Sequence, residues 1–106
     1  MAATRLIVLF NLKPGRSVAD YEAWARKTDL PTVNGLKSVA EFSVFRVTGL
    51  LGDDVARPPY QYVEIIDVKD MDCFGDEVNT DAMRRIAADF QDWADPVFLN
   101  TARLEA

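Results

Sequence analysis

The sequence predicts an α+β domain in which two helices cover one face of a four-stranded antiparallel sheet. Two observations predict this class. The order strand–helix–strand occurs twice along the chain, and 106 residues leave room for one hydrophobic core, so residues 1–106 are interpreted as a single domain. In chain order, the expected elements are strand 5–12, helix 17–27, strand 39–47, strand 60–68, helix 80–93 and strand 96–104.

The first strand and helix are marked by a change in hydrophobic period. Residues 5–12 alternate between two apolar faces, with Leu6, Val8, Phe10 and Leu12 on one and Ile7 and Leu9 on the other. Ser17 is a suitable N-cap for the helix, in which Glu22 and Arg26 are expected to pair on the solvent side. Pro31 is expected to lie beyond the end of this helix, because proline rarely continues one.

The second half of the chain repeats the pattern after a long loop. Strands 39–47 and 60–68 flank residues 49–59, whose glycines, aspartates and prolines exclude regular structure. A short helical turn is expected at 70–74, broken near Gly75. The helix 80–93 then has one apolar stripe, and Pro96 ends it; the stripe consists of Met83, Ile86, Ala87, Phe90 and Trp93.

An uncovered apolar sheet face predicts self-association. Two helices can cover only one face, yet the strands are apolar on both. Burying one apolar side chain contributes about 1.5–3 kcal/mol, so a face with several of them is expected to be covered. The simplest cover is a second copy of the chain, giving a symmetric homodimer with the two sheets packed together.

Composition excludes several kinds of site and partner. The net charge is −5, and no basic run exceeds Arg84–Arg85, which argues against nucleic acid. Histidine is absent, so no imidazole is present as a base, and no zinc-binding spacing occurs; neither a metal nor a cofactor is expected. The run from Leu6 to Leu12 is too short to span a membrane, and the single cysteine, Cys73, favours a reducing cytoplasm.

Glu64 is the leading candidate for a catalytic residue. It lies among apolar and aromatic residues in the strand 60–68, where burial would raise the pKa of its carboxyl toward neutrality. The alternative is a structural carboxylate paired with Arg46 on the neighbouring strand, since structural ion pairs perturb pKa values too.

A group of aromatic and polar residues could form a binding pocket. Aromatic side chains stack on flat ligands, although most aromatic residues at strand or helix periods simply form core. Asn11, a polar interruption in the first strand, could orient a ligand carbonyl or N–H, whereas Asp29 is interpreted as a turn or cap residue. The candidate ligand-binding residues are Asn11, Tyr21, Trp24, Arg46, Tyr60, Tyr62 and Trp93.

Four long segments resemble the REDY-like, HapK family of small bacterial proteins: TRLIVLFNLKPG at 4–15, DYEAWARKTDLPTV at 20–33, FSVFRVTGLLG at 42–52 and PYQYVEIIDV at 59–68. The resemblance implies a ferredoxin-like βαββαβ fold that dimerises as an α/β barrel. It also implies a link to the biosynthesis of prodigiosin-type tripyrrole pigments. It implies no set of catalytic residues.

Three functions are consistent with these observations. The first is a cytoplasmic homodimer that binds a small planar pyrrolic or polyketide-like intermediate without a cofactor. The second is a cofactor-free enzyme of isomerase, cyclase or monooxygenase type, with Glu64 as acid or base and Tyr62, Trp24 and Asn11 positioning the substrate. The third is a purely structural dimer. The first two predict a cavity on which polar atoms converge, and the third predicts a solid core.

Overall fold

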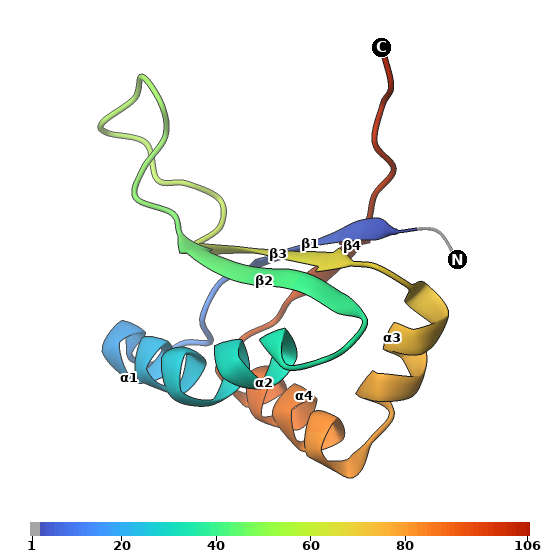
Figure 1. The fold of residues 1–106 in the computed structure, drawn as a ribbon. Helices are drawn as coiled ribbons and strands as arrows, with labels where there is room; N and C mark the ends of the chain where they lie inside the picture. The colour runs from blue at the N-terminus through green and yellow to red at the C-terminus, as the bar shows by residue number, and fades with distance from the viewer. Residues whose placement is uncertain (1–2) are drawn as a thin grey trace.

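The computed structural model describes residues 3–106 and has the expected α+β architecture. The strands are β1 (Thr4–Phe10), β2 (Val39–Arg46), β3 (Tyr62–Val68) and β4 (Val97–Asn100). They form one antiparallel sheet in the order β2-β3-β1-β4. The helices α1 (Val18–Trp24), α2 (Leu30–Asn34) and α4 (Asp81–Trp93) lie on one side of this sheet (Figure 1).

The first helix is longer than predicted, and it contains Pro31. α1 continues through a π-helical turn, η1 (Ala25–Asp29), into α2. The expectation that the helix ends before Pro31 is wrong. The wider π turn lies directly before the proline, so Pro31 occupies the first turn of α2. A proline is tolerated there because its missing N–H is not needed for a hydrogen bond. Residues four apart in an α-helix drift by about 40°. The wider π turn opposes this drift and keeps one stripe buried: Tyr21, Ala25, Asp29 and Val33.

The short helix and the last strand also differ clearly from prediction, while the other strands differ by one or two residues at their ends. α3 (Met71–Val78) runs through Gly75, where a break was expected. The Asp70 side chain caps it by accepting from the N–H groups of Asp72 and Cys73, which offsets the modest cost of one helical glycine. β4 ends at Asn100, so the last residues of the expected strand 96–104 leave the sheet. The expected start of helix 80–93 is confirmed, since Thr80 caps α4.

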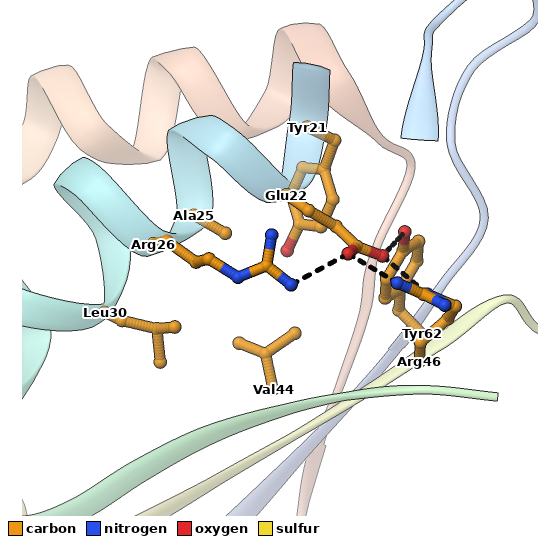
Figure 2. Close-up of a pocket in the computed structure, with 8 residues that line it drawn as sticks. All are labelled: Tyr21, Glu22, Ala25, Arg26, Leu30, Val44, Arg46 and Tyr62. Atoms are coloured by element: carbon orange, nitrogen blue, oxygen red, sulfur yellow. Dashed lines mark hydrogen bonds and ion pairs between the residues drawn. The ribbon is translucent and has the colours of Figure 1, made fainter. Parts of the chain in front are cut away.

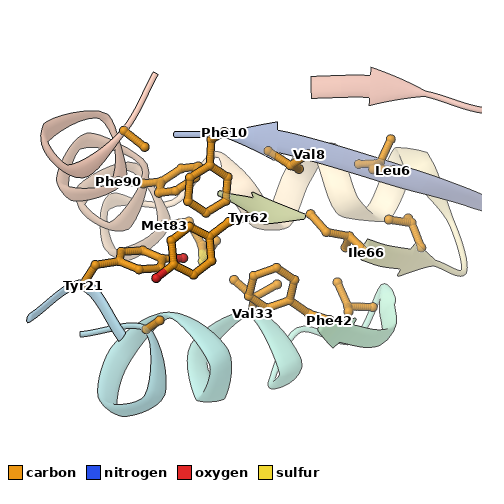
Figure 3. Close-up of a cluster of buried hydrophobic side chains, with 14 residues drawn as sticks. Leu6, Val8, Phe10, Tyr21, Val33, Phe42, Tyr62, Ile66, Met83 and Phe90 are labelled. Atoms are coloured by element: carbon orange, nitrogen blue, oxygen red, sulfur yellow. The ribbon is translucent and has the colours of Figure 1, made fainter. Parts of the chain in front are cut away.

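The core lies between the sheet and the helices and is centred on Phe10 (Figure 3). This ring stacks on Tyr62 at a centroid distance of 5.2 Å and makes edge-to-face contacts with Tyr21 and Phe90 at 5.6 and 4.9 Å. Such aromatic contacts stabilise the packing beyond the area they bury. The alternation predicted for the first strand is confirmed, because Leu6, Val8 and Phe10 are all buried here.

The opposite sheet face, called the open face below, has no helix over it in the described chain. Strand register places Ser43, Ile65, Ile7 and Leu99 in one row across it, and Phe45, Val63, Leu9 and Val97 in the next. The loop between β2 and β3 and the C-terminal segment both extend from this side of the sheet (Figure 1). No helix in residues 3–106 has the length and apolar character needed to cross a membrane.

Candidate functional site

A small pocket lies between the helical segment α1–η1–α2 and the strands β2 and β3 (Figure 2). Its volume is about 130 Å³. One wall is apolar, another is aromatic, and three charged side chains meet at one end. The lining residues are Tyr21, Glu22, Ala25, Arg26, Leu30, Val44, Arg46 and Tyr62.

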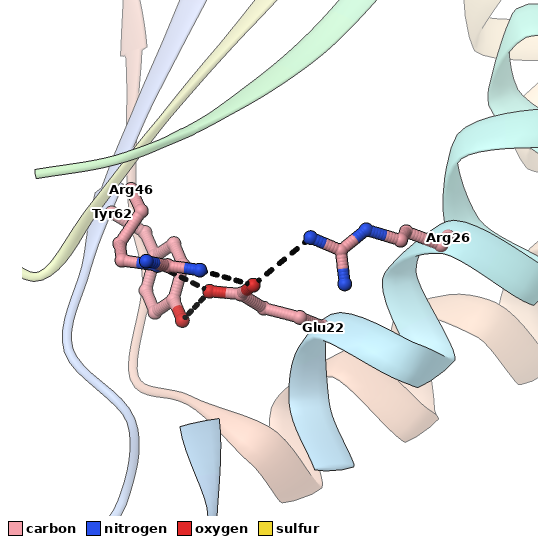
Figure 4. Close-up of polar contacts among 4 residues, drawn as sticks. All are labelled: Glu22, Arg26, Arg46 and Tyr62. Atoms are coloured by element: carbon pink, nitrogen blue, oxygen red, sulfur yellow. Dashed lines mark hydrogen bonds and ion pairs between the residues drawn. The ribbon is translucent and has the colours of Figure 1, made fainter. Parts of the chain in front are cut away.

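Glu22 organises the charged end of this pocket (Figure 4). Arg46 donates to both of its carboxylate oxygens, with Nε–Oε2 and Nη2–Oε1 distances of 2.7 Å. The hydroxyl of Tyr62 donates to Oε2 at 2.7 Å, and Arg26 donates to Oε1 at 3.2 Å. The pairing of Glu22 with Arg26 is confirmed. The prediction that the pair lies on the solvent side of the helix is wrong for Glu22, which is buried and faces β2 and β3.

These hydrogen bonds determine the ionisation of the cluster. Hydrogen bonds from Arg46, and then from Tyr62, lower the pKa of Glu22 to about 2. Burial, together with the bond to this carboxylate, raises the pKa of Tyr62 to about 12. At neutral pH the cluster therefore contains an ionised Glu22, two guanidinium groups and a neutral phenol.

Glu64 lies at the centre of the helix-covered sheet face. Its neighbours in register are Val44 on β2 and Val8 on β1, and it is 3% exposed. Its Oε2 has no hydrogen-bond partner among residues 3–106, and the same holds for the hydroxyl of Tyr21. Burial, and then the charge of Asp29, raise the pKa of Glu64 well above its usual range. The proposed structural pair with Arg46 is wrong, because that guanidinium binds Glu22 instead.

Asp29 is a second buried acid near Glu64. The π-helical turn directs this residue into the protein, where it is 5% exposed, and not into a cap or turn as predicted. Burial raises the pKa of its carboxyl to about 7. The charges of Glu64 and Asp29 both add to burial in raising the pKa of Tyr21. Two carboxyl groups that favour the protonated form thus lie close to one phenol of the pocket.

The predicted ligand-binding residues separate into two groups. Tyr21, Arg46 and Tyr62 come together at the pocket. Trp24 and Trp93 belong instead to the aromatic packing around α4: Trp24 stacks on Phe90 at 6.5 Å, and Trp93 lies under the guanidinium of Arg16 at 4.4 Å.

Asn11 and Tyr60 lie at the end of the sheet, away from the pocket lining. Asn11 donates through Nδ2 to the carbonyl of Pro59 at 3.0 Å and accepts from the N–H of Gln61 at 2.9 Å. It therefore holds the segment that leads into β3. Tyr60 belongs to that segment and is half-buried.

Three charged residues in or near the site were not identified from sequence: Glu22, Arg26 and Asp29. The helical spacing of Glu22 and Arg26 also fits an ordinary exposed ion pair. The available signal was Arg46. A cation on the apolar face of a strand indicates that a carboxylate lies opposite it. For Asp29 the sequence contains no such signal, because its burial depends on the π-helical turn.

The pocket presents apolar, hydrogen-bonding and charged side chains, and the buried acids Glu64 and Asp29 lie near its Tyr21 without lining it. In residues 3–106, no three His, Cys, Asp or Glu side chains form a group suited to holding a metal ion. Cys73 lies outside the pocket, and burial raises the pKa of its thiol.

Comparison with known proteins identifies the class and then the family. The fold is ferredoxin-like α+β, and the family described as REDY-like protein HapK matches residues 4–104. The chain therefore belongs to the HapK family. The crystal structure of HapK from Hahella chejuensis is similar with a TM-score of 0.77 and 25% identity, over 97% of this chain and 94% of that one.

Two further structures share the fold at lower identity. The Arabidopsis thaliana protein At3g17210 has a TM-score of 0.78 and 12% identity, with 97% of each chain covered. A protein of unknown function from Thermobifida fusca, described as dimeric and ferredoxin-like, has a TM-score of 0.73 and 17% identity, over 95% of this chain and 91% of that one. A search of curated proteins found no significant match.

Proposed function

We propose that this protein binds a small planar molecule, pyrrolic or polyketide-like, in the pocket between α1–η1–α2 and the sheet. The observation that carries the proposal is the convergence of polar groups on a cavity, where a purely structural dimer would have a solid core. Tyr21 and Tyr62 line the inner end of the cavity at 0% and 1% exposure, and Leu30 and Val44 form an apolar wall opposite the charged end. This combination of apolar walls and a few placed polar groups is typical of small-molecule sites.

The size of the pocket limits the ligand. A volume of about 130 Å³ is below the range of about 300–1,000 Å³ that is usual for drug-sized molecules. The site therefore suits a molecule of one or two small rings. Membership of the HapK family supports a pyrrolic intermediate of prodigiosin-type secondary metabolism, held in the cytoplasm without a cofactor.

The proposed working form is a homodimer that buries the open face. Phe45, Val97 and Leu99 are each 40% exposed or more on this face, beside the half-buried Ile7 and Ile65. Leu51 and Val55 on the loop and Leu104 on the C-terminal segment are almost fully exposed, and these segments extend from the same side. They could close over a second sheet. Descriptions of the fold neighbours from Thermobifida fusca and Bacteroides fragilis as dimeric support this assembly.

A second candidate function is proton transfer on the bound molecule. It is favoured by one observation: among residues 3–106 a buried carboxyl oxygen of Glu64 has no hydrogen-bond partner, and it lies near the equally unpartnered hydroxyl of Tyr21 and a second buried acid. Structural carboxyls at such positions normally have hydrogen-bond partners. In this role Glu64 would act as the acid or base and Tyr21 would contact the substrate.

Native mass spectrometry of the protein with pyrrole and bipyrrole aldehydes would test both functions. A dimer that gains the mass of an unchanged ligand is the result expected for binding. A protein-dependent change in ligand mass, lost in Glu64→Gln with binding intact, would favour the enzyme. Proton exchange alone leaves the mass unchanged in ordinary water, so the same series in D₂O is needed. A dimer that takes up no compound would contradict both.

A further inference from the structure

We propose that Arg26 and Arg46 form a subsite for an anionic group, so that the ligand of this pocket is a planar carboxylate. The inference rests on the proposed binding function and specifies the chemical class of the ligand. It starts from the unequal charges at the end of the pocket, where two guanidinium groups meet one carboxylate.

The hydrogen-bonding capacity of the two arginines exceeds what Glu22 can use. A guanidinium group has five N–H donors. Arg46 uses its Nε and Nη2 on Glu22, and Arg26 uses only Nη2. The remaining donors have no partner among the described residues, while Glu22 already accepts from Arg46, Arg26 and Tyr62. The arrangement therefore has spare donors and an excess of one positive charge.

The position of the arginines makes these donors available to a ligand. Both arginines line the pocket. The side chain of Arg26 is 70% exposed and that of Arg46 is 56% exposed. In Figure 2 the Arg26 guanidinium extends along the pocket from the helix, between Leu30 and Glu22. A carboxylate bound here would lie between Arg26, which makes one hydrogen bond of 3.2 Å to Glu22, and Arg46, which makes two of 2.7 Å to it.

The charge of the whole protein makes this feature selective. The protein has a net charge of −5 and as a whole repels small anions. The charged end of the pocket, with two arginines and one glutamate, has the opposite sign. Planar guanidinium groups match the geometry of carboxylates, and such charge-assisted hydrogen bonds are about twice as strong as neutral ones. The half-buried side chains of Leu30 and Val44 would contact the planar part of the same molecule.

The test compares pyrrole-2-carboxylate with its neutral isostere, pyrrole-2-carboxamide, by isothermal titration calorimetry at low salt. The carboxylate is expected to bind the protein at least about tenfold more tightly, because it alone forms charge-assisted bonds. Arg26→Gln should reduce the affinity for the carboxylate by about tenfold and change that for the amide by less than about twofold. Lys27→Gln, which removes the same charge from the adjacent exposed position, should change neither.

Each outcome bears on a different claim. Equal binding of acid and amide, or an equal loss of acid affinity in Arg26→Gln and Lys27→Gln, would overturn the anionic subsite and leave the binding function standing. If neither compound nor the larger bipyrrole aldehydes bind, the proposed function itself fails. Circular dichroism of Arg26→Gln would establish that the variant is folded, and its exposed side chain makes unfolding a poor explanation for lost affinity.

Discussion

Tyr62 on β3 donates a hydrogen bond of 2.7 Å to Glu22 on α1, 40 residues earlier in the chain. This bond joins the first residue of β3, an inner strand of the sheet, to the helix that covers it. Arg46 on β2 binds the same carboxylate, so three elements distant in sequence meet at one acid. The pocket lies beside this junction, and its shape therefore depends on Glu22.

Removing the Tyr62 hydroxyl should destabilise the fold and leave the packing of the ring intact. Tyr62→Phe is expected to lower the free energy of unfolding by about 1.5–3 kcal/mol, the usual worth of a hydrogen bond to a charged group. Urea denaturation measures this change. The matched variant Tyr60→Phe, at a half-buried position outside the pocket, should differ from the parent by less than about 0.5 kcal/mol. Equal effects of the two substitutions would contradict the role of the junction.

The buried acids should make the protein less stable as the pH rises. Asp29 and Glu64 have raised pKa values when folded, so the unfolded chain loses their protons at lower pH than the folded protein does. The contribution of Asp29 to the free energy of unfolding is thus greatest below about pH 4. It falls as the pH rises, up to the folded pKa of about 7. Glu22, with a pKa of about 2, acts in the opposite direction and loses its contribution between about pH 4.5 and 2.

Neutral variants separate these contributions. Asp29→Asn and Glu64→Gln should each flatten the decline in the free energy of unfolding between about pH 4 and 8. The free energy of unfolding of each variant, relative to that of the parent, should therefore be higher at pH 8 than at pH 4. Thermal unfolding across this range gives the profile. Asp76→Asn, on the exposed side of α3, is the control. A decline with the same slope in all three variants would show that neither buried acid is responsible.

A charge on the open face should prevent self-association. Leu9→Glu places a carboxylate between Val63 and Val97 in the row that a second sheet is proposed to cover. Multi-angle light scattering should show a dimer for the parent and a monomer for this variant. Ala88→Glu, on the exposed side of α4, should remain dimeric. A dimeric Leu9→Glu would place the interface elsewhere.

Asn11 should matter for stability and not for ligand binding. Asn11→Ala removes both hydrogen bonds to the segment before β3, and a loss of about 1–3 kcal/mol in unfolding free energy is expected. The affinity for a pyrrole aldehyde should change by less than about twofold, because the residue does not line the pocket. A large loss of affinity in a variant that remains folded would restore Asn11 to the binding site.

Hydrophobic periodicity was sufficient to predict the strands, their order and the existence of one covered and one open sheet face, but not which residues lie on which face, because the strands are apolar on both. In β1, for example, the continuous apolar run predicts a strand, and the structure then buries Leu6, Val8 and Phe10 and leaves Ile7 and Leu9 half-buried on the open face. The extent of the first helical segment could not be predicted, because a π-helical turn before Pro31 places the proline in the first turn of α2, where its missing N–H is tolerated. Gly75 was misleading for a similar reason, since the Asp70 cap favours α3 despite the glycine.

The site was less predictable than the fold. Tyr21, Tyr62 and Arg46 were identified because aromatic and charged residues in a core strand or on a helix stripe are conspicuous. Glu22 and Asp29 were not, because the same residue types on exposed helix faces look identical in one sequence. Which acid binds Arg46 depends on how α1 lies over the sheet, and local sequence does not contain that information.

The central claim is that the pocket between α1–η1–α2 and the sheet binds a small planar ligand. The most direct test is a titration of ¹⁵N-labelled protein with pyrrole-2-carboxylate, followed by NMR. Saturable shifts centred on the amides of Ala25, Arg26, Leu30 and Val44 are the expected result. Shifts confined to the open face, or no shifts at millimolar concentrations of this compound and of a bipyrrole aldehyde, would contradict the account.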